Sequence, residues 1–149
     1  MKKLIIFDWG RTLFDNETNA LFPETKDLLA YLAVNYTLAI VSIAKAESIE
    51  HRERVIDEHS LRALFASIMF VGADAKYTAY ERTLKELGYA AEQTIVLDDR
   101  TIRGIAWGNR NCATTIWLQN GKFANELPNE TTGEPTHTIH KLGELYVIL

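Results

Sequence analysis

Short apolar segments alternate along this chain with segments of helical periodicity, and this alternation constrains the fold more than any other feature. Strands joined through helices pair in parallel, so the pattern predicts an α/β fold built on a parallel sheet. The predicted strands are nearly continuous apolar runs, as expected where helices cover both faces of a sheet. They are Leu4–Phe7, Thr37–Val41, Ser67–Val71, Thr94–Leu97 and Thr114–Leu118, with a weaker sixth at Thr136–Ile139.

Each gap between these runs holds little besides one helix. We therefore expect a doubly wound, Rossmann-like sheet of five or six strands, formed by residues 1–149 as a single domain with no cap domain. Phe14–Phe22 is the one segment near the first strand that could form a flap, and Asn120–Pro135 is the longest predicted loop. The predicted helices begin at Pro23 and Glu24, cover about Ala46–His59, run from near Lys76 to a cap at Gly88, and occupy Ile102–Asn109 and Leu142–Leu149.

The composition excludes several classes of protein. The 149 residues are 47% hydrophobic and 24% charged, as in ordinary globular proteins, and the net charge of −4 gives no signature of nucleic-acid binding. The apolar run that ends at Asp8 is too short for a signal peptide or a membrane span, so we expect a cytoplasmic protein with no membrane partner. Cys112 is the only cysteine, which fits a reducing compartment, and we expect it to be buried.

Polar residues that could carry chemistry follow the predicted strands. Asp8 follows the first strand, Ser42 the second, and Asp98 and Asp99 the fourth, while Lys76 begins the helix before the fourth. The carboxyl ends of strands in a doubly wound sheet meet along one edge, so we expect these side chains to face one crevice. Carboxylates suit Mg²⁺, and lysine and serine suit phosphate oxygens. The set is coherent for phosphoryl transfer through an aspartyl phosphate.

The same residues, in the same order, resemble the motifs of the haloacid dehalogenase-like (HAD) hydrolases. The first family motif, Asp-x-Asp-x-Thr, is matched in part by Asp8-Trp9-Gly10-Arg11-Thr12, and the second, a Ser or Thr after the next strand, by Ser42. The third, a Lys before a helix, is matched by Lys76, and the fourth, an acidic pair after a strand, by Asp98-Asp99. The resemblance spans about residues 4–119. Within the superfamily the chain is most similar to capless members such as the magnesium-dependent phosphatase group.

The resemblance implies a Mg²⁺ site and a nucleophile. Asp8 would be both the nucleophile and a Mg²⁺ ligand, and the backbone carbonyl of Gly10 would be a second ligand. Asp99, with or without Asp98, would complete the metal site.

The resemblance also implies a phosphate site and an activity. Ser42 and Lys76 would hold the phosphate, and Thr12 would support the loop. The protein would be a Mg²⁺-dependent phosphatase that acts on a phosphorylated substrate through an aspartyl phosphate.

Three positions depart from the family pattern. The second aspartate of the first motif protonates the leaving group and then activates water, and Gly10 can do neither. Arg11 replaces a small residue and stays protonated, and Gly104 stands where some relatives carry a second acidic residue. The alternative function is therefore a catalytically impaired HAD-fold protein that binds metal or a phosphorylated partner without efficient turnover. If turnover is fast, Asp15 on the flap is the first candidate for the missing base.

Each of these residues also has a purely structural interpretation. Asp8 could cap a turn, Ser42 or the pair Asp98-Asp99 could cap a helix, and Lys76 could be an ordinary surface lysine. A response-regulator receiver is rejected because its acidic pair follows the first strand. A dehalogenase stays open because those relatives also lack the second aspartate. Without a cap the site should be open, so we expect a large phosphorylated substrate or cover from another subunit of a homo-oligomer.

Overall fold

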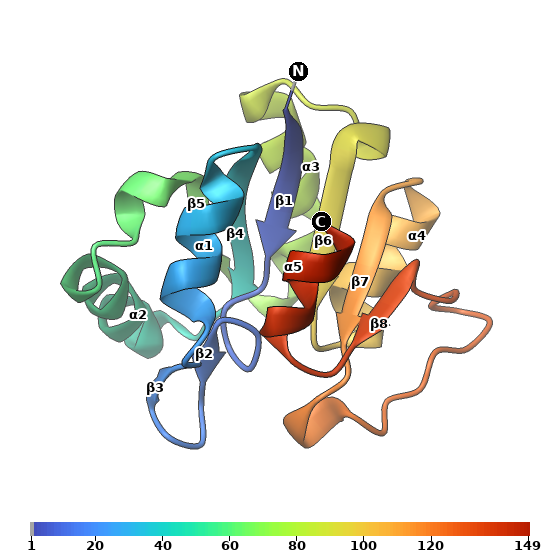
Figure 1. The fold of residues 1–149 in the computed structure, drawn as a ribbon. Coiled ribbons are helices and arrows are strands. Elements are labelled where there is room, and N and C mark those ends of the chain that lie inside the picture. The colour runs from blue at the N-terminus through green and yellow to red at the C-terminus, as the bar shows by residue number, and fades with distance from the viewer. Residues whose placement is uncertain (1) are drawn as a thin grey trace.

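The central element is a six-stranded sheet in which every neighbouring pair of strands is parallel (Figure 1). The computed structural model describes residues 2–149. The strands are β1 (Lys3–Phe7), β4 (Tyr36–Ile43), β5 (Phe65–Val71), β6 (Thr94–Asp98), β7 (Thr114–Leu118) and β8 (His137–Ile139). The predicted strands, including the weaker sixth, are all present, and their predicted ends agree with the structure within two residues.

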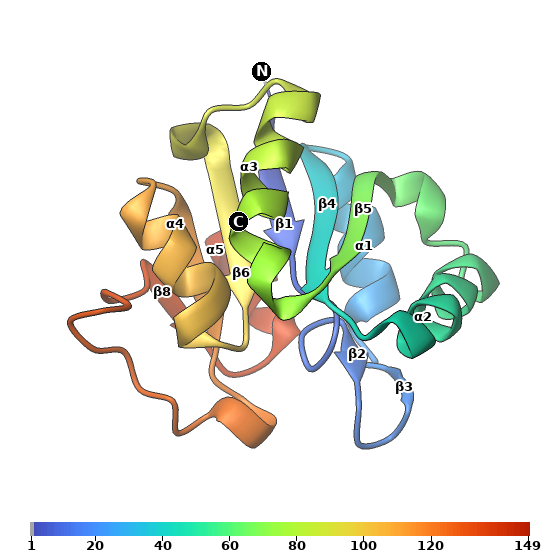
Figure 2. The same ribbon diagram turned by 180° about the vertical axis from the view of Figure 1, so that it is seen from behind.

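Helices cover both faces of this sheet. α1 (Thr25–Ala33) and α5 (Leu145–Ile148) lie on the near face in Figure 1, and α3 (Lys76–Leu87) and α4 (Ala106–Arg110) on the face seen in Figure 2. Alternate residues of β1 enter the two apolar layers: Ile5 and Phe7 pack in one, Leu4 and Ile6 in the other. The doubly wound fold is therefore confirmed. Within residues 2–149, no helix is long and apolar enough to cross a membrane.

The strand order β5-β4-β1-β6-β7-β8 places β1 at the point where the chain changes direction. From β1 the chain passes to β4 and β5 on one side, and then crosses back to β6, β7 and β8 on the other. The carboxyl end of β1 is therefore a topological switch point, the place where open α/β sheets bind ligands. Asp8, the first residue after β1, lies at this point.

The connections around β1 are simple. The predicted flap is present as an antiparallel pair, β2 (Phe14–Asp15) and β3 (Ala20–Leu21), which precedes α1. α2 (Ala46–Glu58) and a 3₁₀ turn at Arg62–Leu64 connect β4 to β5. Within residues 2–149, no further domain is inserted between the strands of the sheet.

Two details differ from the sequence predictions. The helix expected at Ile102–Asn109 is a π-helical turn at Thr101–Ile105 followed by the short α4. π-Helical turns often occur at functional sites, and this one follows directly after the acidic pair. Cys112 is exposed, not buried, because it lies in the turn between α4 and β7 with a φ of 63° and belongs to neither apolar layer.

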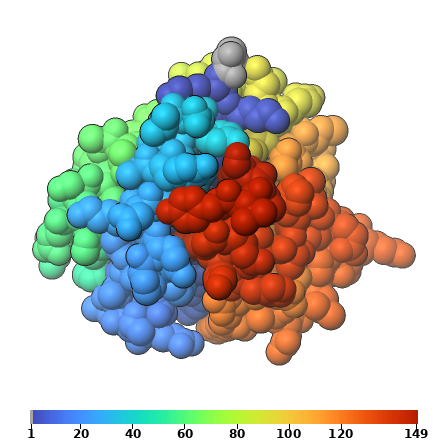
Figure 3. Space-filling view, in the orientation of Figure 1, coloured from blue at the N-terminus to red at the C-terminus, as the bar shows by residue number. Residues whose placement is uncertain are grey.

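The last residues of the chain close one face of the molecule. Figure 3 shows the carboxyl-terminal segment beside α1 on the surface that faces the viewer. The rings of Tyr31 and Tyr146 lie 4.9 Å apart between their centroids, and the Tyr36 hydroxyl donates to the carbonyl oxygen of Leu149 at 3.4 Å. These contacts join the end of the chain to α1 and to the start of β4.

Candidate active site

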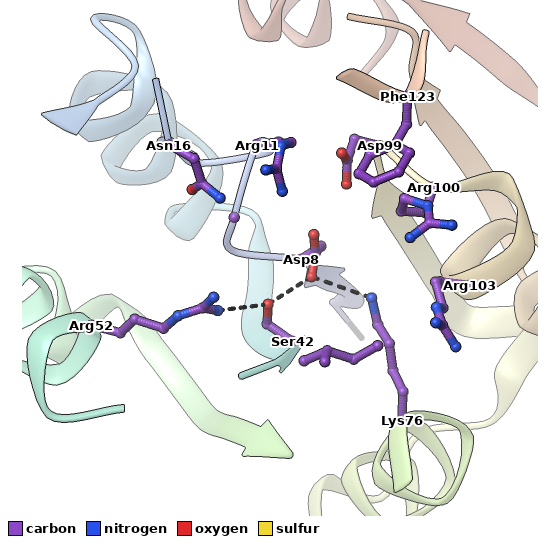
Figure 4. A pocket seen from close by; sticks show the side chains of 12 residues that line it. Asp8, Arg11, Asn16, Ser42, Arg52, Lys76, Asp99, Arg100, Arg103 and Phe123 are labelled. Atoms are coloured by element: carbon purple, nitrogen blue, oxygen red, sulfur yellow. Dashed lines mark hydrogen bonds and ion pairs between the residues drawn. The ribbon is translucent and has the colours of Figure 1, made fainter. Parts of the chain in front are cut away.

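Asp8 stands at the centre of a pocket of about 200 Å³ at the carboxyl edge of the sheet (Figure 4). Its backbone N–H donates to the carbonyl oxygen of Leu97 at 3.0 Å, which continues the pairing of β1 with β6. The chain then turns sharply, because the carbonyl oxygen of Trp9 accepts hydrogen bonds from the N–H groups of Thr12, Leu13 and Phe14. The turn fixes the Asp8 carboxylate at the carboxyl edge of the sheet, and the residue is only 7% exposed.

The Asp8 carboxylate is held by the residues that the sequence predicted. Its Oδ1 accepts a hydrogen bond from the Ser42 hydroxyl at 2.7 Å and another from Lys76 Nζ at 3.2 Å. Its Oδ2 accepts a longer bond from the Thr12 hydroxyl at 3.4 Å. Ser42 lies inside β4, and α2 begins after Lys45, so Ser42 is not a helix cap. The structure therefore brings together three elements that are distant in the sequence.

Lys76 is a buried cation and not a surface lysine. The residue is 2% exposed, and its Nζ donates to Asp98 Oδ2 at 2.8 Å as well as to Asp8. Burial alone would lower the pKa of Lys76, but the charges of Asp8 and Asp98 overcome this effect and hold the pKa well above its usual value. Lys76 is therefore charged at all ordinary pH values and can bind a phosphoryl oxygen beside Asp8.

Asp98 and Asp99 have different environments although they are adjacent. Asp98 is fully buried, and donors from the protein bind both of its oxygens: the N–H of Arg100 on Oδ1 at 3.0 Å, and Lys76 with the N–H of Gly104 on Oδ2. Gly104 is needed for this approach, because a Cβ there would lie 2.7 Å from Asp98 Oδ2. Asp98 thus organises the turn that follows it, but it is not a helix cap, because it ends β6 and the N-cap of the next helical turn is Arg100.

Asp99 is 2% exposed, and its Oδ2 is buried without a hydrogen-bond partner. Burial, followed by the charges of Asp98 and Asp8, raises the pKa of Asp99 to about 10. Asp8, Asp98 and Asp99 each offer an oxygen, and these oxygens lie within 4.8 Å of one another. Three crowded carboxylates with one unsatisfied oxygen fit a divalent cation, which would relieve both their repulsion and the orphaned acceptor. The expectation that Asp8, Asp98 and Asp99 face one crevice is confirmed.

The position of the missing acid is occupied by neutral and cationic groups. A Cβ added to Gly10 would lie 3.4 Å from Nδ2 of Asn16 and 3.8 Å from Nη2 of Arg52. Asn16 on the flap lines the pocket, whereas Asp15 does not. The carboxylate of Asp15 accepts hydrogen bonds from the N–H of Glu17 and the hydroxyl of Thr18, each at 3.0 Å. The structure thus gives Asp15 a role within the flap and does not place it beside Asp8.

Of the arginines that surround Asp8, the sequence pointed only to Arg11, as a departure from the family motif. Arg52 reaches across from α2 and donates to the Ser42 hydroxyl at 3.3 Å. Figure 4 shows Arg11 on the flap side of Asp8 and Arg103 on the opposite side, beyond Lys76. Arg100 also lines the pocket, and its Nη2 lies 2.9 Å from Oε2 of Glu126. The sequence held one signal for two of the others. Arg100 and Arg103 follow the acidic pair within four residues, so they lie near the carboxyl end of the fourth predicted strand.

The aromatic side chain of Phe123 lines the same pocket. It comes from a 3₁₀ turn at Gly121–Phe123, inside the long segment predicted as a loop. The guanidinium carbon of Arg100 lies 3.8 Å from the ring centroid, and that of Arg11 lies 5.5 Å from it. Through these two cation–π contacts, Phe123 links the loop after β1, which carries Arg11, to the loop after β6, which carries Arg100.

Comparison with known proteins places the fold. No family model and no curated protein sequence matches the chain. Among solved structures, the proposed HAD-hydrolase YfnB from Bacillus subtilis, bound to magnesium, superposes with a TM-score of 0.81 at 15% identity, covering 99% of this chain and 98% of that chain.

Other matching structures carry related descriptions. The haloacid dehalogenase-like hydrolase SP0104 from Streptococcus pneumoniae has a TM-score of 0.72 at 15% identity and covers 99% of this chain and 98% of its own. A predicted phosphoglycolate phosphatase from Haemophilus somnus has a TM-score of 0.75 at 12% identity, with 99% and 97% covered. The resemblance expected from the four sequence motifs is thus matched by the architecture. The chain has the fold of the HAD hydrolases.

Proposed function

We propose that this protein is a Mg²⁺-dependent phosphohydrolase that acts through an aspartyl phosphate on Asp8. The observation that carries the proposal is the pair of donors on the Asp8 carboxylate, Ser42 at 2.7 Å and the buried Lys76 at 3.2 Å. A phosphoryl group beside Asp8 would meet the same hydroxyl and ammonium groups, which could bind two of its oxygens.

The residues divide the reaction into two steps. In the first, an oxygen of Asp8 forms a bond to the phosphorus atom while the bond from phosphorus to the leaving oxygen breaks, and the leaving oxygen takes up a proton from solvent. In the second, a water oxygen attacks the phosphorus of the aspartyl phosphate and gives its proton to solvent, the bond to the Asp8 oxygen breaks, and phosphate departs with the Asp8 carboxylate restored. Ser42 and Lys76 hold the phosphoryl oxygens in both steps.

The metal site would be made by Asp8, Asp99 and the backbone carbonyl of Gly10. When bound, Mg²⁺ would neutralise negative charge shared between the carboxylates and the phosphoryl oxygens. Asp98 is a weaker candidate for a ligand, because its oxygens already accept three hydrogen bonds from the protein. Its role in this proposal is to fix Lys76 and the turn that contains Gly104.

The second step, hydrolysis of the aspartyl phosphate, lacks a general base in this site. Gly10 supplies no carboxyl group, and its neighbours Asn16 and Arg52 cannot accept a proton at neutral pH. General acid–base assistance is worth roughly 10²–10⁴ in rate, so hydrolysis of the aspartyl phosphate should be slow. This observation favours the second candidate function, a HAD-fold protein that binds metal and a phosphorylated partner without efficient turnover.

A comparison of p-nitrophenyl phosphate hydrolysis by the wild type and Asp8→Asn, with and without Mg²⁺, separates the two candidates. The phosphohydrolase proposal expects activity that needs both Asp8 and Mg²⁺. Activity that survives Asp8→Asn would refute it. If no activity is seen while Mg²⁺ still raises the melting temperature, the binding function is favoured. We also propose, because the pocket holds only about 200 Å³, that the rest of a larger phosphorylated substrate remains outside it.

A further inference from the structure

Three arginines of the Asp8 pocket have no anionic partner from the protein. Within residues 2–149, no carboxylate oxygen lies within 4.0 Å of a side-chain nitrogen of Arg11, Arg52 or Arg103. Arg100, by contrast, is paired with Glu126. The Nε atom of Arg103 is also buried with no hydrogen-bond partner. A buried donor without a partner is costly, so this group is poised for a ligand that the protein itself does not supply.

Arg11 is held in an unfavourable backbone conformation. Its φ is 60°, in the left-handed region where a residue with a Cβ is strained and glycine is not. Its guanidinium is oriented by the ring of Phe123 at 5.5 Å, and it lines the pocket beside Gly10. A strained arginine whose charged group faces a pocket indicates that the side chain has a function there.

The charges of the pocket exceed what a single phosphoryl group needs. Lys76 and Ser42 both contact Asp8, where the proposed phosphoryl group would bind, and Arg52 donates to Ser42 and can share in binding the same group. Arg11 and Arg103 then remain, on two sides of Asp8, with no anion to bind (Figure 4). The chain as a whole has a net charge of −4, so this local excess of positive charge is not a property of the whole surface.

We propose that the substrate carries a second anionic group, a carboxylate or a second phosphate, close to the phosphoryl group, and that the unpaired positive charges of Arg11 and Arg103 hold it in the pocket. The proposal rests on the proposed function for the position of the phosphoryl group. The pocket, at about 200 Å³, is smaller than the roughly 300–1,000 Å³ of sites for drug-sized ligands, so the two anionic groups must be only a few bonds apart. Guanidinium groups bind both kinds of anion through paired hydrogen bonds.

Two phosphonates that differ in one anionic group test this inference without turnover. Phosphonoacetate carries a carboxylate beside its phosphonate, and ethylphosphonate is of similar size without it. Isothermal titration at fixed Mg²⁺ should show that the wild type binds phosphonoacetate about tenfold more tightly or better, as expected for a desolvated charge-assisted contact. The double variant Arg11→Gly/Arg103→Gln should lose this preference and keep its affinity for ethylphosphonate.

The control is Arg54→Gln, which removes an exposed arginine of α2 that lies outside the pocket and should leave both affinities unchanged. If the double variant fails to fold, Arg11→Gly alone, which relieves backbone strain, should still reduce the preference. Equal binding of the two phosphonates by the wild type, or a preference that survives in the variants, would overturn the inference. Neither ligand is an ester, so these outcomes are independent of whether Asp8 is ever phosphorylated.

Discussion

Restoring a carboxylate at position 10 is the sharpest perturbation of the proposed chemistry. A Cβ at Gly10 would lie 3.4 Å and 3.5 Å from the two amide atoms of Asn16 and 3.8 Å from Arg52 Nη2, which are ordinary or slightly tight contacts with flexible side chains. Gly10 does not have a positive φ, so an aspartate there brings no backbone strain. Gly10→Asp should therefore fold and should point its carboxyl group into the pocket beside Asp8.

The expected gain follows from what the new carboxyl group would do. As a base it would activate the water that attacks the aspartyl phosphate, and such assistance is worth roughly 10²–10⁴. Arg52 Nη2 lies close enough to pair with it, which holds the carboxyl group ionised and so weakens it as an acid. We therefore expect steady-state turnover of p-nitrophenyl phosphate to rise by about 10²-fold, the low end of that range.

Stopped-flow release of p-nitrophenolate measures both steps. The wild type should show a rapid burst and then a slow phase, because the leaving group needs little protonation whereas the second step lacks a base. Gly10→Asp should shorten or abolish the slow phase. The matched control is Gly10→Asn, which has nearly the same shape and cannot take a proton. The reasoning fails if Gly10→Asn accelerates turnover as much as Gly10→Asp, or if the wild type is already fast and shows no burst.

Four further outcomes follow from the geometry and the charges of the site. Lys76→Met leaves Asp8 and Asp98 without their cation and should lower the free energy of unfolding, measured by urea denaturation, by about 3–5 kcal/mol. The control Lys45→Met removes an exposed lysine and should change it very little. Arg11→Gly removes a left-handed arginine and should raise the free energy of unfolding by up to about 1 kcal/mol; a clear loss would show that Arg11 stabilises the fold. With its pKa raised to about 10, Asp99 keeps its proton in the folded, metal-free protein. In the unfolded chain the same carboxyl group loses its proton above about pH 4. The free energy of unfolding of the metal-free protein should therefore fall as the pH rises toward 10. Mg²⁺ displaces that proton, so its apparent affinity, read from melting curves, should rise by up to tenfold per pH unit from about pH 6 to 8; a flat profile would contradict this.

The sequence was sufficient for the sheet and for the centre of the site. Apolar runs covered on both faces predict parallel strands, and the polar residues at their carboxyl ends, Asp8, Ser42 and Asp99, must then lie close together because the strands are neighbours. Lys76 was found because it begins a helix whose apolar spacing is clear. These predictions depend on backbone topology, which local patterns specify well.

The sequence did not predict that Arg52, Arg103 and Phe123 line the pocket, and the reason is physical. Arg52 lies on the second turn of α2, a helix with alternating charges, and nothing in that pattern shows which arginine faces the sheet edge and which, like Arg54, faces solvent. Arg103 depends on a π-helical turn that widens the helix start, and Phe123 on a turn within a long irregular segment. The directions of these side chains follow from tertiary packing, which a single sequence does not encode in a readable pattern.

The central claim is that Asp8 becomes phosphorylated, and acid quenching of the working enzyme tests it most directly. The wild type is mixed with p-nitrophenyl phosphate and Mg²⁺, quenched in acid during the slow phase, digested, and analysed by mass spectrometry. Because the second step lacks a base, the aspartyl phosphate should accumulate, and the peptide that contains Asp8 should carry the mass of one phosphoryl group, whereas Asp8→Asn should carry none. Turnover without any phosphoryl group on Asp8, or with the group on another residue, would contradict the account.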